Sequence, residues 1–264
     1  MDNTLFLYLD FLGFRELTKD PSKVRKLFSV LDECNLHRDS AYRAIVFSDT
    51  LLAYNTAPGI SRSPQSSELM FLIEFVQDIT HRLASSGIFF RALIRYGAFE
   101  HKRLKNIDAY FGDALISSYD HEAGLQGTGL FLQSSLVPYD NVFRSKSFSP
   151  EYHFSFLAYD LIRATDWGGE YPLPEEVIQW REAGIEERVY RQVEYLRSLW
   201  QGCFHDHPSI RSKFLNTWAM YEQNYRGLTE ALRASDFRPE SLCDIDWKPA
   251  EREFDKRTRF WQQE

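Results

Sequence analysis

The stretch LFLYLDFLGF at residues 5–14 decides the fold, because an apolar run there ends in a carboxylate, Asp10. A second run, AIVFSDTLLAY at residues 44–54, places Asp49 between two strand-like halves. A buried carboxylate is costly unless it is paired or bound to a cation, so both aspartates are expected at the rim of a sheet. If the two strands are neighbours, their carboxylates are close enough to hold Mg²⁺ or Mn²⁺ over a phosphate.

Hydrophobic patterns predict an α+β domain over residues 1–169. Strands are expected at residues 4–11, 42–47, 50–54, 88–99, 129–137 and 154–162, and helices at 21–36, 67–86 and 112–123. The polar pair Ser48-Asp49 between two strands predicts a hairpin with Asp49 at its tip. The order strand, helix, hairpin, helix, strand, helix, strand is typical of an α+β sandwich with helices on one face of the sheet.

Residues 170–264 are expected to form a helical C-terminal extension. Apolar residues at helical spacing predict helices within residues 173–201 and 207–234, followed by a charged and aromatic tail at 239–264. The tripeptide His205-Asp206-His207 has the composition of a metal cluster. No further ligand follows it at a suitable spacing, so a loop that precedes a helix is the favoured interpretation.

Composition excludes several classes of partner. The chain has 264 residues, of which 44% are hydrophobic and 26% charged, as is ordinary for a globular protein. The net charge is −7, whereas a general nucleic-acid binder has an excess of basic residues, so no nucleic-acid partner is expected. Cys34, Cys203 and Cys243 form no closely spaced pair and indicate reduced thiols in a cytoplasmic protein. The sequence shows neither a signal peptide nor an apolar run of the roughly 18–20 residues that span a bilayer, so no membrane partner is expected.

Four blocks of sequence, in this order, resemble the class III nucleotide cyclases: LDFLGF at 9–14, FSDT at 47–50, RALIRYG at 91–97 and GDALISSY at 112–119. They follow the family's order with similar gaps over roughly residues 4–137. With FSDT in place of a Gly-Asp pair, the sequence of these blocks is most similar to that of the pyrimidine nucleotide cyclases of bacterial anti-phage signalling. The resemblance implies a ferredoxin-like catalytic sheet whose second face is covered by another catalytic domain.

The resemblance implies a two-metal site. Asp10, Asp49 and the carbonyl of Phe11 would hold two Mn²⁺ or Mg²⁺ ions, one near the ribose 3′-hydroxyl and one on the triphosphate. Backbone N–H groups at Gly13 and Phe14, in a turn between a strand and a helix, are candidates for phosphate binding. The alternative is structural, with Asp10 capping a loop and Asp49 serving only as a turn residue.

Arg91 and Arg95 lie two residues apart on one expected strand, so their side chains share a face. Arginines within a core strand need an anionic partner. A nucleotide triphosphate is one candidate, with Arg91 in binding and Arg95 in catalysis. A structural pair with Asp or Glu is the equal alternative. Arg103 and Lys105, in the following loop, are further phosphate candidates.

Base recognition departs from the adenylyl cyclase pattern. Ile45 and Ala109 stand where the family has its purine-reading Lys and Asp. Ile116 and Asp120 stand where the Asn and Arg that stabilise the transition state are expected. An apolar Ile45, with Tyr54 nearby, favours a smaller pocket that suits a pyrimidine.

These observations predict a homodimeric, metal-dependent cyclase with active sites at the dimer interface. It would convert UTP or CTP, with UTP weakly favoured, to the 3′,5′-cyclic monophosphate and pyrophosphate. The resemblance implies a second messenger in anti-phage defence and a separate effector that binds it. The alternative is a non-catalytic, cyclase-like module that binds a nucleotide or a partner, which the absent Asn and Arg favour.

Overall fold

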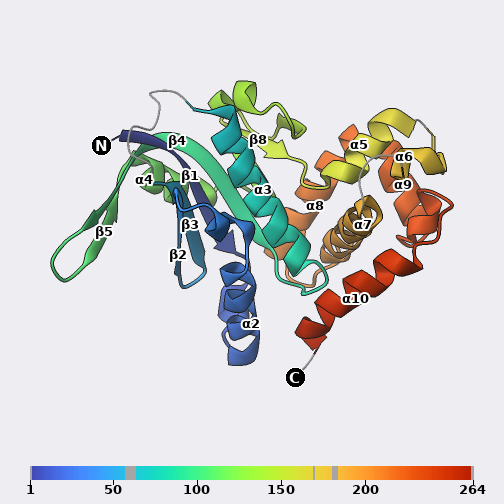
Figure 1. Ribbon diagram of the computed structural model, residues 1–264, viewed down its shortest axis with the longest axis horizontal. Coiled ribbons are helices and arrows are strands. Elements are labelled where there is room, and N and C mark those ends of the chain that lie inside the picture. The colour runs from blue at the N-terminus through green and yellow to red at the C-terminus, as the bar shows by residue number, and fades with distance from the viewer. Residues whose placement is uncertain (1, 57–63, 169, 180–183, 263–264) are drawn as a thin grey trace. The chain divides into compact units, whose positions relative to one another are not determined.

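The computed structural model describes residues 2–56, 64–168, 170–179 and 184–262. The chain divides into two compact units (Figure 1). The sheet unit comprises Met1–Ile79 and Phe89–Ser155, and the helical unit comprises Thr80–Ile88 and Phe156–Glu264. The division after Ser155 comes earlier than the boundary expected at residue 169.

The sheet unit is built on eight strands in the order β2-β3-β1-β4-β6-β8-β7, with β5 paired to β4 outside this path. The central strand β1 is antiparallel to both β3 and β4, and β4 is parallel to β6. The strands are β1 Asp2–Phe11, β2 Tyr42–Phe47, β3 Thr50–Asn55, β4 Phe90–Arg103, β5 Asp108–Phe111, β6 Gly129–Gln133, β7 Ser145–Ser147 and β8 Tyr152–Ser155. The expected α+β class and the hairpin at Ser48-Asp49 are thus confirmed.

The helices of the sheet unit follow the expected order along the chain. They are α1 Phe14–Leu17, α2 Pro21–Asp32, α3 Ser66–Leu83, which belongs to this unit as far as Ile79, and α4 Asp113–Glu122, with 3₁₀ turns at Asn35–Arg38 and Ser134–Tyr139. Asp20 caps α2, because its carboxylate accepts the N–H groups of Ser22 at 3.0 Å and Lys23 at 3.3 Å. The chain therefore re-enters a helix directly after the short turn α1.

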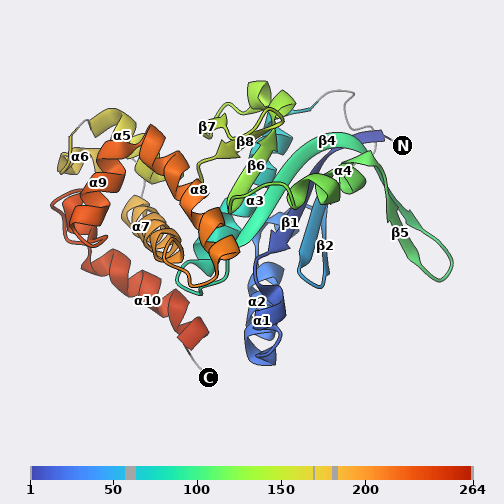
Figure 2. The same cartoon turned by 180° about the vertical axis from the view of Figure 1, so that it is seen from behind.

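The two faces of the sheet carry different helices. On one face, Tyr42 stacks on Phe71 of α3 with ring centroids 4.4 Å apart, and Asn55 donates to Glu68 of α3 at 3.2 Å. On the opposite face, Gly97 of β4 lies under Ala114 of α4, where an added Cβ would meet that side chain at 3.5 Å. Figures 1 and 2 show α3 and α4 on these opposite sides. The helix expected at 112–123 is thus present as α4, but it lies over β1 and β4 on the face opposite α3 and not on one common face with the other helices. This side of the sheet is called the α4 face.

The helical unit confirms the helical character expected for the C-terminal part of the chain. Its helices are α5 Tyr159–Gly168, α6 Glu175–Gln179, α7 Ile185–Gly202, α8 Pro208–Asn224, α9 Arg226–Ala234 and α10 Lys248–Gln262, with a 3₁₀ turn at Pro239–Ser241. The strand expected at 154–162 is wrong beyond Ser155, since α5 begins at Tyr159. A short apolar run does not distinguish a strand from a buried helix.

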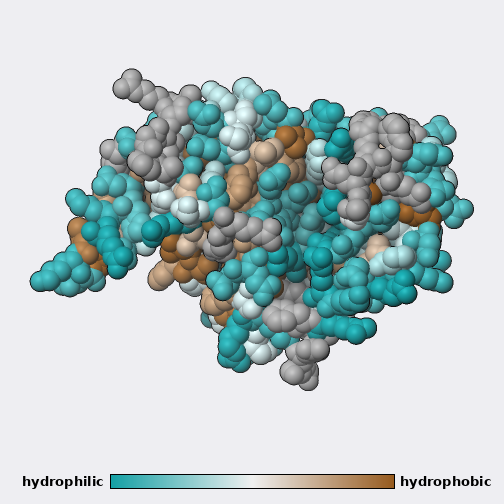
Figure 3. Space-filling view, viewed as in Figure 1, coloured by the Kyte–Doolittle hydropathy of each residue, from teal (hydrophilic) through white to brown (hydrophobic). Residues whose placement is uncertain are grey.

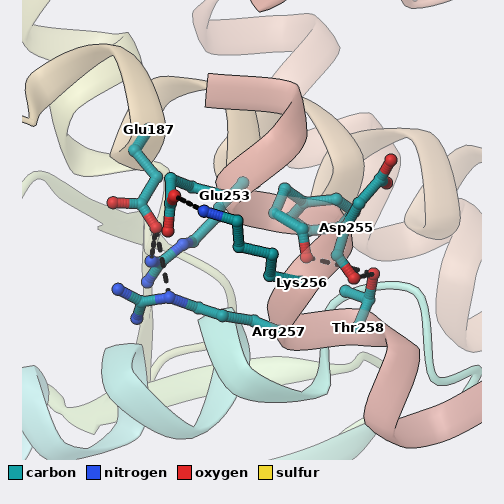
Figure 4. Close-up of polar contacts among 8 residues, drawn as sticks. Glu187, Glu253, Asp255, Lys256, Arg257 and Thr258 are labelled. Atoms are coloured by element: carbon teal, nitrogen blue, oxygen red, sulfur yellow. Dashed lines mark hydrogen bonds and ion pairs between the residues drawn. The ribbon is translucent and has the colours of Figure 1, made fainter. Parts of the chain in front are cut away.

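Helix α10 forms from the charged tail because one of its faces is apolar. Ala250, Phe254 and Thr258, four residues apart, are buried, and Phe254 packs on Tyr190 of α7 at 5.4 Å between ring centroids. An ion pair between Glu187 and Arg257, at 3.2 Å, closes the edge of this contact (Figure 4). Within the described part of the chain, no helix combines the length and hydrophobicity needed to cross a bilayer.

Candidate metal and nucleotide site

The pairing of β1 with its two neighbours brings both predicted aspartates to one rim of the sheet. Asp10 lies opposite Thr50 of β3 and opposite Arg91 of β4. The turn that carries Asp49 is tight, with Ser48 in the left-handed region at φ 57°. The N–H of Phe11 donates to the carbonyl of Asp49 at 2.8 Å. The two aspartates therefore belong to adjacent backbone segments, as the sequence predicts.

The side chain of Tyr8 links the two carboxylates. Tyr8 and Asp10 share the α4 face because side chains alternate along a strand. Burial raises the pKa of Tyr8, and the charges of Asp10 and Asp49 raise it further, against a hydrogen bond with the Thr50 side chain. The phenol thus lies within electrostatic reach of both carboxylates. Tyr8, Asp10, Asp49 and Thr50 are called the carboxylate site below.

The chemistry of the carboxylate site fits a divalent metal. Asp10 and Asp49 are half-buried, and carboxylate and hydroxyl oxygens are the hard donors that Mg²⁺ and Mn²⁺ prefer. Among the described residues, no group of three or more His, Cys, Asp or Glu side chains is arranged to hold a metal. A Mg²⁺ site made of one or two carboxylates is completed by water and substrate phosphate. The expected coordination by the Phe11 carbonyl remains a prediction.

The turn after β1 matches the predicted sequence of strand, glycine and helix, but the helix is short. Gly13 has φ 72° and precedes α1, a single turn over Phe14–Leu17. Phe14 is buried, so any phosphate contact there must come from its backbone. One helical turn sums few peptide dipoles. Phosphate binding at Gly13 and Phe14 therefore remains a prediction.

Arg91 has protein partners in the structure. Its guanidinium is 4% exposed, pairs with Glu122 at the end of α4 and donates to the carbonyl of Leu125. Burial lowers the pKa of Arg91, and the charge of nearby Asp10 opposes that effect. This is the structural pairing that the sequence left as an alternative. A direct contact of Arg91 with nucleotide stays a prediction that these partners do not favour.

Arg95 is half-buried on the same face and donates to the hydroxyl of Tyr152 on β8. Its guanidinium lies 5.8 Å from the centroid of the Tyr152 ring. Tyr152 follows Arg95 by more than fifty residues, so no sequence pattern points to this contact. The catalytic role expected for Arg95 remains a prediction.

The two residues expected near the base differ in accessibility. Ile45 on β2 lies opposite Leu52 and is half-buried. Tyr54 is buried, and its hydroxyl is hydrogen-bonded to His101 Nδ1 at 3.0 Å. His101 Nε2 in turn lies 3.0 Å from Asp108 Oδ1 on β5. Burial raises the pKa of Tyr54 to about 12. Tyr54 therefore ties β3 to the β4–β5 hairpin, and its contact with a base remains a prediction.

Sequence reasoning missed several side chains around the site. Tyr8 is two residues before Asp10, and the period of a strand would have placed it beside that carboxylate. Phe47, opposite Thr50, is 80% exposed, and Ile116 and Tyr119 of α4 are 60% and 69% exposed. Hydrophobic side chains are also exposed on the β4–β5 hairpin (Figure 3). Large exposed apolar side chains in this density indicate an interaction surface.

His205, Asp206 and His207 lie exposed in the turn between α7 and α8. The N–H of His207 donates to His205 Nδ1 at 3.0 Å, and the Ser209 hydroxyl lies 2.9 Å from His207 Nδ1. These contacts organise the turn that starts α8, which agrees with the favoured interpretation.

No protein-family profile matches the chain. No curated protein sequence matches it either. The guanylate cyclase domain of RhGC from Catenaria anguillulae in complex with GTP is similar in structure, with 12% identity and a TM-score of 0.45 over 59% of this chain and 96% of that one. The catalytic core of a rhodopsin-guanylyl cyclase with converted specificity, in complex with ATPαS, has 14% identity and a TM-score of 0.46 over 58% and 94%. The adenylyl cyclase CyaB from P. aeruginosa has 10% identity and a TM-score of 0.42 over 58% and 93%. Similarity at this level does not assign the chain to a family.

Proposed function

We propose that this chain is a metal-dependent nucleotide cyclase. The observation that carries the proposal is the adjacency of Asp10 and Asp49 at a half-exposed rim, where β1 meets the β2–β3 hairpin. Both carboxylates are in contact with solvent, and few further protein ligands are nearby among the described residues. Such a site suits a divalent metal ion that is also coordinated by substrate phosphates.

The chemistry would be an intramolecular phosphoryl transfer. The ribose 3′-hydroxyl gives up its proton to water and its oxygen forms a bond to the α-phosphorus, while the bond from that phosphorus to the bridging oxygen breaks and pyrophosphate leaves with the electron pair. Two divalent ions would supply Lewis-acid stabilisation of the attacking and leaving oxygens. Asp10 and Asp49 would hold them, with the Phe11 carbonyl as a further ligand. Thr50 and Tyr8, whose side chains are hydrogen-bonded to each other, would lie beside these ligands.

We propose a pyrimidine substrate, with UTP favoured over CTP. Ile45 and Ala109 offer no side-chain donor or acceptor to a purine edge. A site without such groups cannot favour ATP or GTP through hydrogen bonds at these positions. A role in anti-phage signalling, with a separate effector for the cyclic nucleotide, rests on the resemblance alone. The three buried free thiols suit the reducing cytoplasm, which is the proposed compartment.

We further propose a homodimer with active sites at its interface. Phe47, Thr50, Asp10 and Arg91 form a row of paired residues across four strands, and the exposed ring of Phe47 is at its outer end. Ile116 and Tyr119 expose further apolar surface on α4. A second copy that covers these side chains would bury them and shield the site from water.

The test is incubation of the purified protein with each of the four nucleoside triphosphates and Mn²⁺, with products identified by mass spectrometry. Cyclic UMP as the main product is the expected result, with cyclic CMP second. Cyclic AMP as the main product would remove the pyrimidine proposal but keep the cyclase proposal. No cyclic nucleotide from any substrate, with binding of a triphosphate retained, would favour the non-catalytic module, to which Ile116 and Asp120 at the transition-state positions point.

A further inference from the structure

Arg91 and Glu122 form a charge pair under the carboxylate site. Their side chains are 4% and 14% exposed, and Arg91 also donates to the carbonyl of Leu125, just after α4. A pair this deep is costly to desolvate, and replacement by apolar residues often leaves stability unchanged. Stability alone therefore does not account for the pair.

The position of the pair points to the neighbouring carboxylate. Arg91 is directly opposite Asp10 across β1 and β4, and paired residues point to the same face. The charge of Asp10 acts on the Arg91 guanidinium. Asp10, Arg91 and Glu122 thus form a row of alternating charges, negative, positive and negative. The negative charge of Glu122 offsets the positive charge of Arg91, which would otherwise act on Asp10 alone.

The same pair also fastens the end of α4. The Thr128 hydroxyl donates to the Phe90 carbonyl at 2.9 Å, beside Arg91, and the opposite end of α4 packs on Gly97. The segment from Glu122 to Thr128 is therefore anchored where β4 begins, next to the rim that carries Asp10.

We propose that the Arg91–Glu122 pair is a positioning element that sets the charge at the carboxylate site and thereby its affinity for a divalent cation. The proposal rests on the proposed function, since it takes Asp10 and Asp49 as the cation ligands. With Glu122 present, the field of Arg91 is cancelled at the site. Without it, the uncompensated guanidinium repels the cation, because charges a few ångströms apart interact strongly in a partly buried setting.

The test is a titration of the full chain with Mn²⁺ in the absence of nucleotide, followed by electron paramagnetic resonance of the free ion. Glu122→Gln is expected to weaken Mn²⁺ binding by about tenfold, whereas Arg91→Gln is expected to strengthen it or leave it unchanged. The double variant Arg91→Met/Glu122→Leu removes both charges and should bind within about twofold of the wild type. Glu187→Gln, which breaks a similarly buried Arg–Glu pair on α7, is the matched control and should leave Mn²⁺ binding unchanged.

A charge effect weakens Mn²⁺ binding in Glu122→Gln but not in Arg91→Gln. A loss of packing would weaken Mn²⁺ binding in both single variants. Equal Mn²⁺ affinity in Glu122→Gln and the wild type would overturn the proposal, as would weaker binding in a folded Arg91→Gln. If Glu122→Gln does not fold, Arg91→Gln and the double variant still test the proposal. Weaker Mn²⁺ binding in either of these two variants would contradict the proposed charge compensation. A wild type that binds no Mn²⁺ would instead remove the metal site of the proposed function.

Discussion

The two aspartates at the rim of the sheet unit and three ionisable side chains of the helical unit have opposite surroundings. In the sheet unit, Asp10 and Asp49 are half-exposed at a rim and carry charge where a ligand can meet it. In the helical unit, burial lowers the pKa of His81 to about 3, with Arg191 and Arg188 adding to the effect. Burial likewise raises the pKa of both Cys203 and Cys243 to about 11. The helical unit thus holds these groups in their neutral forms, which can pack in a core. The sheet unit instead exposes charged carboxylates that can bind a ligand.

This contrast predicts that substitutions in the sheet-unit rim change activity with little loss of stability, and that substitutions of buried groups in the helical unit do the reverse.

The largest effect is expected for Asp10→Ala and for Asp49→Ala. Either change should lower turnover by roughly a thousandfold or more, because metal ions supply several kcal/mol of transition-state stabilisation and about 1.4 kcal/mol is tenfold in rate. Circular dichroism should show an unchanged fold, since neither side chain is part of the core. Asp206→Ala, an exposed aspartate of the helical unit, is the matched control and should keep full turnover. Near wild-type rates in either rim variant at limiting Mn²⁺ would refute the metal assignment.

Subunit complementation addresses the dimer. If Arg95 acts across the interface, a mixture of the Asp10→Ala/Asp49→Ala variant with an Arg95→Ala variant should recover activity, because each heterodimer regains one complete site. Up to about a quarter of wild-type activity is expected after equal mixing, since half the dimers are mixed and each has one of two sites. Subunit exchange is checked by native mass spectrometry. No recovery despite exchange would place Arg95 in the same subunit as the aspartates or outside the site.

His81 gives the helical unit a predicted acid sensitivity. Its folded-state pKa of about 3 lies below the ordinary value near 6.5, so the unfolded chain binds the proton first as pH falls. Stability should therefore be lost progressively from about pH 6.5 downward, by at most about 1.4 kcal/mol per pH unit. His81→Gln should lose less stability than the wild type between pH 7 and pH 5 in urea titrations, and exposed His207→Gln should match the wild type. Identical pH slopes in all three proteins would contradict the burial of a neutral His81.

The smallest effect is expected at the edge of the contact between α7 and α10. Arg257 pairs with Glu187 at 3.2 Å, but its side chain is 60% exposed (Figure 4). Arg257→Gln should lower the free energy of unfolding by no more than about 1 kcal/mol. The difference should vanish in 1 M NaCl, where the screening length is about 3 Å. A larger loss that persists in high salt would show that Arg257 contributes through packing.

The order of elements along the chain and the positions of both aspartates at strand ends were predictable because their signals are local, whereas the neighbourhood of β1 and β3 was only assumed. Short continuous apolar runs mark β1 and the β2–β3 hairpin, and the turn at Ser48-Asp49 fixes the register of β2 with β3. The pairing of β1 with β3, which brings Asp49 to Phe11, is a contact between distant segments. The strand β5 was missed because its four residues, Asp108–Phe111, are too few to show a period. Helix α10 was not distinguished within the tail because only every fourth residue is apolar or buried.

The partners of the two arginines could not be predicted, since they come from distant segments. Arg91 meets Glu122 at the end of α4, and Arg95 meets Tyr152 on β8, so both partners depend on tertiary packing. A strand pattern identifies a charged side chain that needs a partner, but it does not say whether a carboxylate, a phenol or a substrate provides one.

The most direct test of the central claim is a crystal structure of the protein grown with Mn²⁺ and a non-cyclisable UTP analogue, with anomalous scattering used to locate the ion. The two-metal proposal predicts anomalous peaks at ordinary metal–oxygen distances of about 2 Å from the carboxylates of Asp10 and Asp49, with the triphosphate also in contact with the ions. A peak elsewhere, or a bound triphosphate whose metal contacts neither aspartate, would contradict the account.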